Sequence, residues 1–247
     1  MVTLIGMGSG KWEALSAQAQ QAVRSAGLVF GAKRLLAGLP ADCMARQFAL
    51  YQPADILETL AQNSGQDAAV LYSGDTGFYS GASGLLTPLR ALGIPARVYP
   101  GVSSIQLLSA ALGRPWQDWK LVSAHGCACD PVAECMMNRS VFFLTGGTET
   151  PASLCQKLTD AGMGEAHGVV GENLGTEAEA IRYGSAAELA GQSFAPLSVL
   201  LVENFDLPQL RAPGFPDESF IRSEVPMTKQ EVRAAALAKL AVMPTDT

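Results

Sequence analysis

The sequence predicts an α/β protein with two domains, and two observations support this fold class. Short apolar strands alternate with segments of helical periodicity along most of the chain, which is the order of elements in α/β folds. The alternation breaks at residues 113–118 and then resumes. We therefore predict an N-terminal α/β domain over residues 1–115 and a second over residues 116–205. A cleft between two domains is a common place for a ligand.

Apolar runs and helix-start signals indicate the elements of the first domain. Ser103 followed by Gln106 matches a capping box and predicts that a helix begins at residue 104. The predicted strands are residues 2–5, 28–30, 68–72 and 96–99, and the predicted helices are residues 13–25, 54–63, 81–92 and 104–112.

The second domain repeats this alternation. Thr150 followed by Pro151 predicts a helix with a threonine cap and a proline in its first turn. The predicted strands are residues 121–123, 141–145, 167–170 and 197–202.

Beyond residue 204 the sequence changes character. Residues 207–217 are rich in proline, which predicts a linker. Thr228 and Glu231 then match a capping box that opens a helix over residues 228–240. We treat residues 206–247 as a separate third segment.

Composition limits the classes of partner. The formal net charge is −6 and the isoelectric point is about 5.0, and no stretch is rich in lysine and arginine, so nucleic acid is not an expected partner. No apolar stretch approaches the roughly 18 residues that span a bilayer. We expect a cytoplasmic protein with a small-molecule ligand and no membrane partner.

The cysteines do not predict a metal site. There are five of them, an odd number in a chain too long to need disulfide bonds. His125, Cys127, Cys129 and Cys135 lie close together in sequence, but structural zinc sites usually use C-x-x-C pairs, and C-x-C matches poorly. Reduced thiols without a metal are expected.

Three loops of small residues follow predicted strands, at residues 6–10, 73–80 and 100–104. In open α/β sheets ligands bind outside the carboxyl ends of the strands. Asp75 would be the acidic group of this site. A dinucleotide fingerprint is incomplete, because Lys11 stands where its third glycine belongs and residues 29–33 offer no acidic residue. These loops favour a neutral or cationic ligand with an adenosine part.

Six sequence motifs stand out in order along the chain: Gly6-Met-Gly-Ser-Gly10, Ser73-Gly-Asp-Thr-Gly-Phe-Tyr-Ser80, Pro100-Gly-Val-Ser-Ser104, Trp116-Gln-Asp118, Ser123-Ala-His-Gly126 and Gly171-Glu-Asn-Leu-Gly175. Together they resemble the tetrapyrrole (corrin/porphyrin) methylases, from residue 1 to about residue 204. Within that family the motif sequences are similar to those of the carbon-5 methyltransferases that act on cobalt-precorrin-7 or precorrin-6Y in cobalamin biosynthesis.

The resemblance implies a homodimeric methyltransferase of two α/β domains, with S-adenosylmethionine in the cleft between them. Its products would be S-adenosylhomocysteine and a precorrin methylated at carbon 5. The alternatives are a methylase that acts at another ring position and a non-catalytic tetrapyrrole-binding module. The cofactor contacts that the resemblance assigns are Gly8, Ser9, Ser73, Gly74, Asp75, Phe78, Ser103, Ser104 and Thr145.

Three residues are candidate proton acceptors: Asp75, His125 and Glu172. Each has a structural alternative, which is a cap or a cofactor contact for Asp75, a loop residue for His125 and the partner of an arginine for Glu172. A precorrin carries many carboxylates, which arginine binds well. The candidate cations for these carboxylates are Lys33, Arg34, Arg114 and Arg182.

Residues 215–233 resemble the start of the carbon-15 methyltransferase and decarboxylase module that often follows these enzymes. We expect residues 206–247 to be a linker and the beginning of that module. Its cofactor motif does not occur before residue 247, so its activity is expected elsewhere, in a fused or separate partner.

Overall fold

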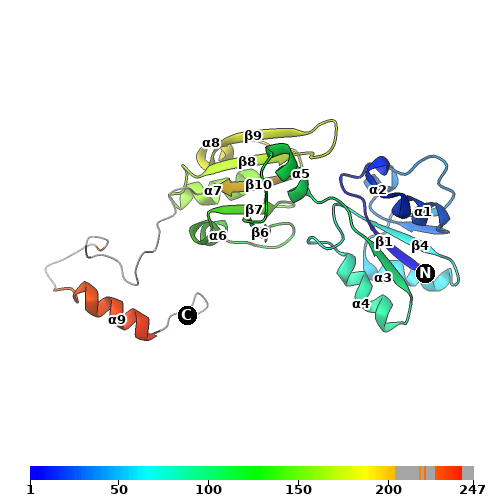
Figure 1. The fold of residues 1–247 in the computed structure, drawn as a ribbon, viewed down its shortest axis with the longest axis horizontal. Coiled ribbons are helices and arrows are strands. Elements are labelled where there is room, and N and C mark those ends of the chain that lie inside the picture. The colour runs from blue at the N-terminus through cyan, green and yellow to red at the C-terminus, as the bar shows by residue number, and fades with distance from the viewer. Residues whose placement is uncertain (204–216, 218–219, 221–225, 241–247) are drawn as a thin grey trace. The chain divides into compact units, whose positions relative to one another are not determined.

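The computed structural model describes residues 1–203, 217, 220 and 226–240. The chain divides into two compact units, Met1–Phe205 and Asp206–Thr247. The first unit contains two five-stranded sheets, and helices cover both faces of each (Figure 1). The predicted fold class, two α/β domains, is confirmed.

The first sheet is entirely parallel and has the strand order β3-β2-β4-β1-β5. Its central strands are continuous apolar runs, as expected for a parallel sheet buried on both faces. Because the strands are parallel, the loops that follow β1, β4 and β5 all emerge at the same end of the sheet, where the strands have their carboxyl ends. The strands are β1 (Val2–Gly6), β2 (Leu28–Phe30), β3 (Arg46–Phe48), β4 (Ala68–Tyr72) and β5 (Ala96–Tyr99).

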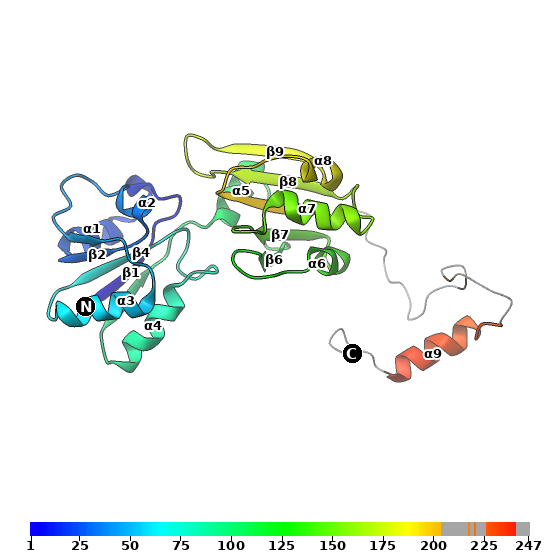
Figure 2. The same ribbon diagram turned by 180° about the vertical axis from the view of Figure 1, so that it is seen from behind.

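Two hydrophobic clusters hold the helices of the first domain on opposite faces of this sheet. In one cluster Val23 and Leu35 pack with Ile5 and Leu71, which places α1 and α2 on one face. The other face is covered by α3 and α4 (Figure 2). The helices are η1 (Trp12–Ala14), α1 (Ala17–Ser25), α2 (Lys33–Leu36), α3 (Pro53–Gln62) and α4 (Ala82–Ala91).

The second sheet is mixed, with the order β6-β7-β10-β8-β9. Only the β6 and β7 pair is parallel among its described pairs. Helices α6, α7 and α8 lie on one face and α5 on the other (Figures 1 and 2). The elements are α5 (Ser104–Leu112), β6 (Lys120–Ser123), α6 (Pro131–Met137), β7 (Ser140–Leu144), α7 (Pro151–Asp160), β8 (His167–Glu172), β9 (Ala180–Ser185), α8 (Ala186–Ala190) and β10 (Ser198–Glu203).

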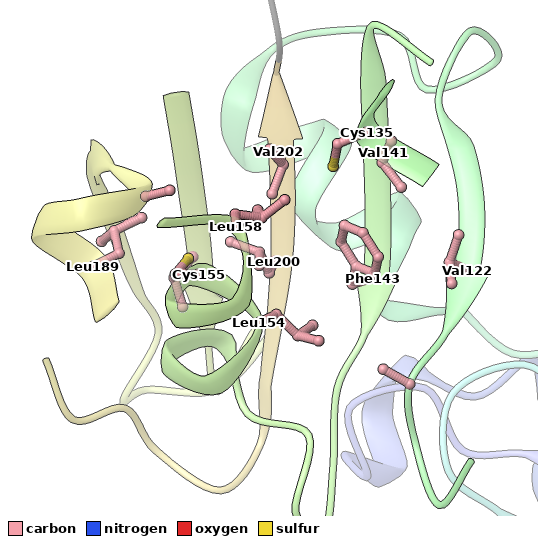
Figure 3. Packing of buried hydrophobic residues seen from close by; sticks show 13 residues of the cluster. Val122, Cys135, Val141, Phe143, Leu154, Cys155, Leu158, Leu189, Leu200 and Val202 are labelled. Atoms are coloured by element: carbon pink, nitrogen blue, oxygen red, sulfur yellow. The ribbon is translucent and has the colours of Figure 1, made fainter. Parts of the chain in front are cut away.

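The core beneath α6, α7 and α8 includes two cysteines. Figure 3 shows Cys135 and Cys155 among apolar side chains that include Phe143 and Leu200. Both thiols are fully buried, and burial raises the pKa of each to about 12. These two cysteines therefore serve as small apolar core residues, whereas Cys127 is exposed.

Several element boundaries differ from the prediction. The helix predicted over residues 13–25 begins at Ala17, because the Ser16 hydroxyl accepts a hydrogen bond from the Ala19 amide at 3.2 Å and caps it there. Helix α6 occupies part of the cysteine-rich segment, where no helix was predicted. Its start is set by Asp130, whose carboxylate accepts from two backbone amides, and by Pro131 in the first turn.

The second unit contains α9 (Gln230–Leu240), which begins two residues after the predicted start at Thr228. No residue of this helix is buried. The predicted linker over residues 207–217 lies outside the described residues except for Asp217. No helix among the described residues is long and apolar enough to span a membrane.

Candidate active site

The loops after β1, β4 and β5 meet backbone to backbone. The Gly8 and Gly74 amides each donate to the other's carbonyl oxygen, at 3.1 and 2.9 Å. A Cβ atom at Gly6 would lie 2.6 Å from the Gly101 nitrogen and 2.7 Å from the Gly74 oxygen. Such distances are too short for any side chain, so glycine is required at position 6 by the close approach of the three loops, whereas Gly8 and Gly74 are favoured by their left-handed backbone, with φ of 58° and 62°.

Asp75 fastens two of these loops together. One carboxylate oxygen accepts a hydrogen bond from the Gly77 amide at 2.8 Å, within its own loop, and the other accepts from the Gly101 amide at 3.0 Å. Both oxygens of this half-buried carboxylate thus bind backbone amides. A hydrogen bond with a charged acceptor is worth about 1.5–3 kcal/mol, so Asp75 contributes to the loop geometry directly.

A cavity of about 280 Å³ opens beside this junction. Its walls come from both sheets, because the loops of the first domain face residues that end β7 and β8 and begin β10. His125 also lines it, and Glu172 is not among its lining residues. The lining includes all nine residues that the resemblance assigns to the cofactor, namely Gly8, Ser9, Ser73, Gly74, Asp75, Phe78, Ser103, Ser104 and Thr145. Their contact with a cofactor stays a prediction.

His125 has a defined orientation at this cavity. Its Nδ1 atom lies 3.2 Å from the Thr145 carbonyl oxygen, and since a carbonyl only accepts, Nδ1 carries the proton. In the neutral ring Nε2 is then the free acceptor. A side chain at Gly146 would overlap the imidazole ring, so this glycine makes room for His125.

Thr145 and Ser103 are the most buried of the predicted contacts, at 6% and 3% exposed. The Thr145 hydroxyl donates to the Ser198 carbonyl at 2.6 Å, which leaves its oxygen able to accept. Ser103 and Gln106 form the predicted capping box, in which the Gln106 side chain accepts from the Ser103 amide at 2.8 Å. These bonds fix both residues against rotation.

Phe78 and Tyr79 connect the two domains at the cavity. The ring of Phe78 lies 6.2 Å from that of Phe142 in the second sheet, and the Tyr79 hydroxyl donates to the Leu121 carbonyl at 3.1 Å. The Tyr79 backbone is left-handed, with φ of 46°, a conformation that costs a non-glycine residue about 1–3 kcal/mol. Desolvation and the nearby Cys127 and Glu134 raise the pKa of this phenol, so its hydroxyl stays protonated and able to donate.

Glu172 lies in an ion pair outside the cavity lining. Its carboxylate accepts from Arg182 Nε at 2.5 Å and from the Ala195 amide at 2.7 Å. Burial alone would raise its pKa, but these two bonds outweigh it, and the pKa lies below its usual value. Pairing with an arginine was the structural alternative expected for this residue.

The candidate cations also divide into residues that form ion pairs with a carboxylate and residues that do not. Arg182 pairs with Glu172, and Arg114 forms a two-pronged ion pair with the buried Glu203. Arg34 lines the cavity and donates to the Ser73 hydroxyl. Lys33 precedes it on α2 and is exposed, but is not among the cavity-lining residues.

Sequence reasoning missed part of the cavity wall. Residues 196–199 line it where β10 begins, and Asn173 lines it in a left-handed conformation, with φ of 49°. Tyr79 lies in the motif Ser73–Ser80 and Asn173 in the motif Gly171–Gly175. Membership of these motifs was the sequence signal that could have identified them as cavity residues. No group of three or more His, Cys, Asp or Glu side chains in the described part of the chain is arranged to hold a metal ion.

Most of the chain matches one protein-family model. The model of the tetrapyrrole (corrin/porphyrin) methylases matches residues 1–190. The chain belongs to this family, as the sequence motifs predicted.

Two relatives with narrower names match the chain. It is 32% identical to the cobalt-precorrin-7 C(5)-methyltransferase of Salmonella typhimurium strain LT2 over 185 residues, which cover 74% of this chain and 90% of that enzyme. It is 28% identical to the decarboxylating precorrin-6Y C(5,15)-methyltransferase of a Sinorhizobium species over 246 residues. That match covers 97% of this chain but only 59% of the longer relative.

Among solved structures, the uroporphyrin-III C-methyltransferase of Thermus thermophilus in complex with S-adenosylhomocysteine shares the fold. The TM-score is 0.66 at 20% identity, and the match covers 82% of this chain and 97% of that one. The predicted class of enzyme, an S-adenosylmethionine-dependent methyltransferase, is confirmed by the family, and so is the predicted cofactor.

We predict that Gly101→Ala destabilises the fold and the cofactor site together. The Cβ atom of the new alanine would lie 2.6 Å from the Gly6 carbonyl oxygen. That oxygen is a backbone atom and cannot shift as the end of a flexible side chain could. The expected loss is about 3 kcal/mol in the free energy of unfolding, measured by urea denaturation, with weaker S-adenosylhomocysteine binding.

The matched control is Gly84→Ala in α4, where the nearest atom to the new Cβ would be Pro53 Cγ at 3.7 Å. This helix-interior change should stabilise by about 0.5–1 kcal/mol. Equal stability of the two variants would contradict the proposed close approach.

We predict that Glu172→Gln lowers the free energy of unfolding by about 1–3 kcal/mol at neutral pH, because it removes the charge that Arg182 and the Ala195 amide bind. The folded-state pKa is lowered, so the ionised carboxylate stabilises the fold above its unfolded pKa. That contribution is lost as the pH falls through the folded value.

Denaturation curves of the wild-type and Glu172→Gln proteins should therefore converge toward acid pH. S-adenosylhomocysteine affinity at pH 7 should be unchanged, since Glu172 is not among the cavity-lining residues. A constant difference in stability between about pH 3 and pH 7 would refute the assigned role.

Proposed function

We propose that the chain methylates carbon 5 of a precorrin or cobalt-precorrin in cobalamin biosynthesis, using S-adenosylmethionine and releasing S-adenosylhomocysteine. The observation that carries the proposal is the single cavity into which all three small-residue loops converge, together with His125 and Thr145. The match across 90% of a cobalt-precorrin-7 C(5)-methyltransferase supports the choice of carbon 5.

The chemistry of the cavity wall fits this cofactor. Hydroxyls and backbone groups of Ser9, Ser73, Ser103 and Thr145 offer hydrogen-bond partners to ribose, adenine and the amino-acid part. Apolar side chains form another part of the wall and suit the adenine ring. The apolar set is Phe78, Val102, Leu107, Leu144, Leu174 and Leu197.

The bound cofactor supplies a methyl group on sulfur: the S–CH₃ bond breaks as the new C–CH₃ bond forms, and the electron pair stays on sulfur. An enamine-like ring carbon is already a fair nucleophile, so the protein contributes mainly position and exclusion of water. The interlocked loops hold one reactant, and the apolar wall removes water from the path. Asp75 acts here as a positioning residue, because both of its oxygens bind loop amides.

After methylation the ring carries one more positive charge until a proton leaves it. His125 is the side chain we assign to that proton. Its Nδ1 proton is held by the Thr145 carbonyl, so Nε2 presents a lone pair at the cavity. Glu172 is assigned to stability, since Arg182 and the Ala195 amide already bind its carboxylate.

We further propose a cytoplasmic homodimer that works beside a carbon-15 methyltransferase and decarboxylase module. The C(5,15) relative supports this module, because its match extends over 97% of this chain and leaves about two fifths of that protein beyond the match. Whether the module is fused or separate does not change the chemistry proposed for residues 1–205.

The function is tested by product analysis. We expect each chain to bind one S-adenosylhomocysteine in calorimetry, and nuclear magnetic resonance of the product made with ¹³C-methyl-labelled cofactor to place the methyl group on carbon 5. A methyl group on another carbon would favour the alternative ring position. Tight cofactor binding without turnover would favour a non-catalytic tetrapyrrole-binding module.

We predict that His125→Ala slows single-turnover methylation by about 100-fold and leaves S-adenosylhomocysteine affinity within about twofold. Added imidazole should restore part of the rate, because it replaces the missing acceptor. Gly146→Ala, which displaces the ring, should show the same loss without rescue. A His125→Ala enzyme with the wild-type rate would remove His125 from proton transfer.

A further inference from the structure

We infer that Arg34 forms a subsite for a carboxylate of the tetrapyrrole substrate at the rim of the cavity. This inference rests on the proposed function, since it names the residue that recognises the substrate class. The chain is acidic overall, with a net charge of −6, so binding of a polycarboxylate requires a local cation.

The other arginines considered for this task already have carboxylate partners. Arg182 binds Glu172, and Arg114 binds Glu203. Removing either arginine from its acidic partner would leave a buried carboxylate without its counter-charge, since Glu172 and Glu203 are only 5% and 4% exposed. Neither arginine is therefore free to recognise a substrate.

Arg34 differs from these two arginines both in its position and in its contacts. Among the residues that the structure describes, it is the one lysine or arginine that lines the cavity, and no carboxylate lies within ion-pair distance of it. Its guanidinium has five N–H donors, and the described contact uses one Nη2 donor on the Ser73 hydroxyl. The remaining donors match the planar, two-pronged geometry of a carboxylate.

The fold presents this side chain at the cavity. Arg34 lies on α2, which follows β2 at the carboxyl edge of the first sheet, and α2 contacts the first glycine loop through Leu35, 3.6 Å from a Cβ built at Gly10. The Ser73 bond fixes the guanidinium beside the second loop. Arg34 is exposed, so its free donors face solvent at the rim, where an entering substrate meets them before the buried wall.

The exposed position favours the substrate carboxylate over the carboxylate of the cofactor itself. The cofactor contacts proposed above include groups buried deep in the cavity wall, such as Ser103 and Thr145, whereas Arg34 lies at the exposed rim. The two assignments predict different binding behaviour, which allows them to be separated by experiment.

The test compares Arg34→Gln and Arg34→Lys with the wild-type full-length chain. Arg90→Gln on α4 is the matched control, because it removes the same charge from an exposed arginine that does not line the cavity. Two quantities are measured: calorimetric affinity for S-adenosylhomocysteine, and equilibrium affinity of the S-adenosylhomocysteine-saturated protein for the cobalt-precorrin substrate under anaerobic conditions, at low and high salt.

We expect Arg34→Gln to weaken substrate affinity by about tenfold, the effect of losing one charge-assisted pair, and to leave S-adenosylhomocysteine affinity unchanged. The substrate affinity of Arg34→Lys should lie between those of the wild type and Arg34→Gln, since lysine keeps the positive charge but lacks the two-pronged donor geometry of the guanidinium. Salt should weaken the wild type more than Arg34→Gln.

Equal weakening of substrate and S-adenosylhomocysteine would assign Arg34 to the cofactor and overturn the inference. Substrate affinity equal to that of Arg90→Gln would also overturn it. A wild-type chain that binds no tetrapyrrole would contradict the inference together with the proposed substrate, whereas a bound substrate methylated at another carbon would contradict only the proposed position.

Discussion

The active-site end of this protein depends on three backbone segments that touch at Gly6, Gly74 and Gly101. The contact excludes every Cβ atom at Gly6 and Gly101, and Asp75 fastens it by accepting from two amides. The parallel sheet makes the contact possible, because it brings the ends of β1, β4 and β5 to one edge. The junction thereby sets the position of the loops with which the first domain lines the cavity.

The second domain completes the site with side chains that have little freedom. Thr145 is held by Ser198, and His125 is held by Thr145. Phe78 and Tyr79 reach from the first domain to Phe142 and the Leu121 carbonyl, respectively. The cavity is therefore bounded by two separately packed cores that are joined through aromatic contacts and a hydrogen bond.

Local signals predicted many of the strands and helices but missed two edge strands, β3 and β9. Residues 68–72 and 104–112 were predicted to the residue, because a buried apolar run and a capping box specify them. Strands β3 and β9 lie at sheet edges and contain no buried residue, and neither is a continuous apolar run. Missing β9 also hid the partner of Glu172: when β8 and β9 pair, Arg182 lies opposite Val170, two residues along β8 from Glu172, and its side chain reaches the Glu172 carboxylate.

The strand order has a consequence for the nascent chain. Strand β1 is buried throughout, yet in the described sheet it bonds only to β4 and β5, and β4 begins at Ala68. An apolar segment made early must therefore wait for residues synthesised much later, which at usual translation rates takes on the order of several seconds. During that interval its backbone donors and acceptors are open to pairing with other chains, and the exposure ends only when β4 and β5 are available to pair with it.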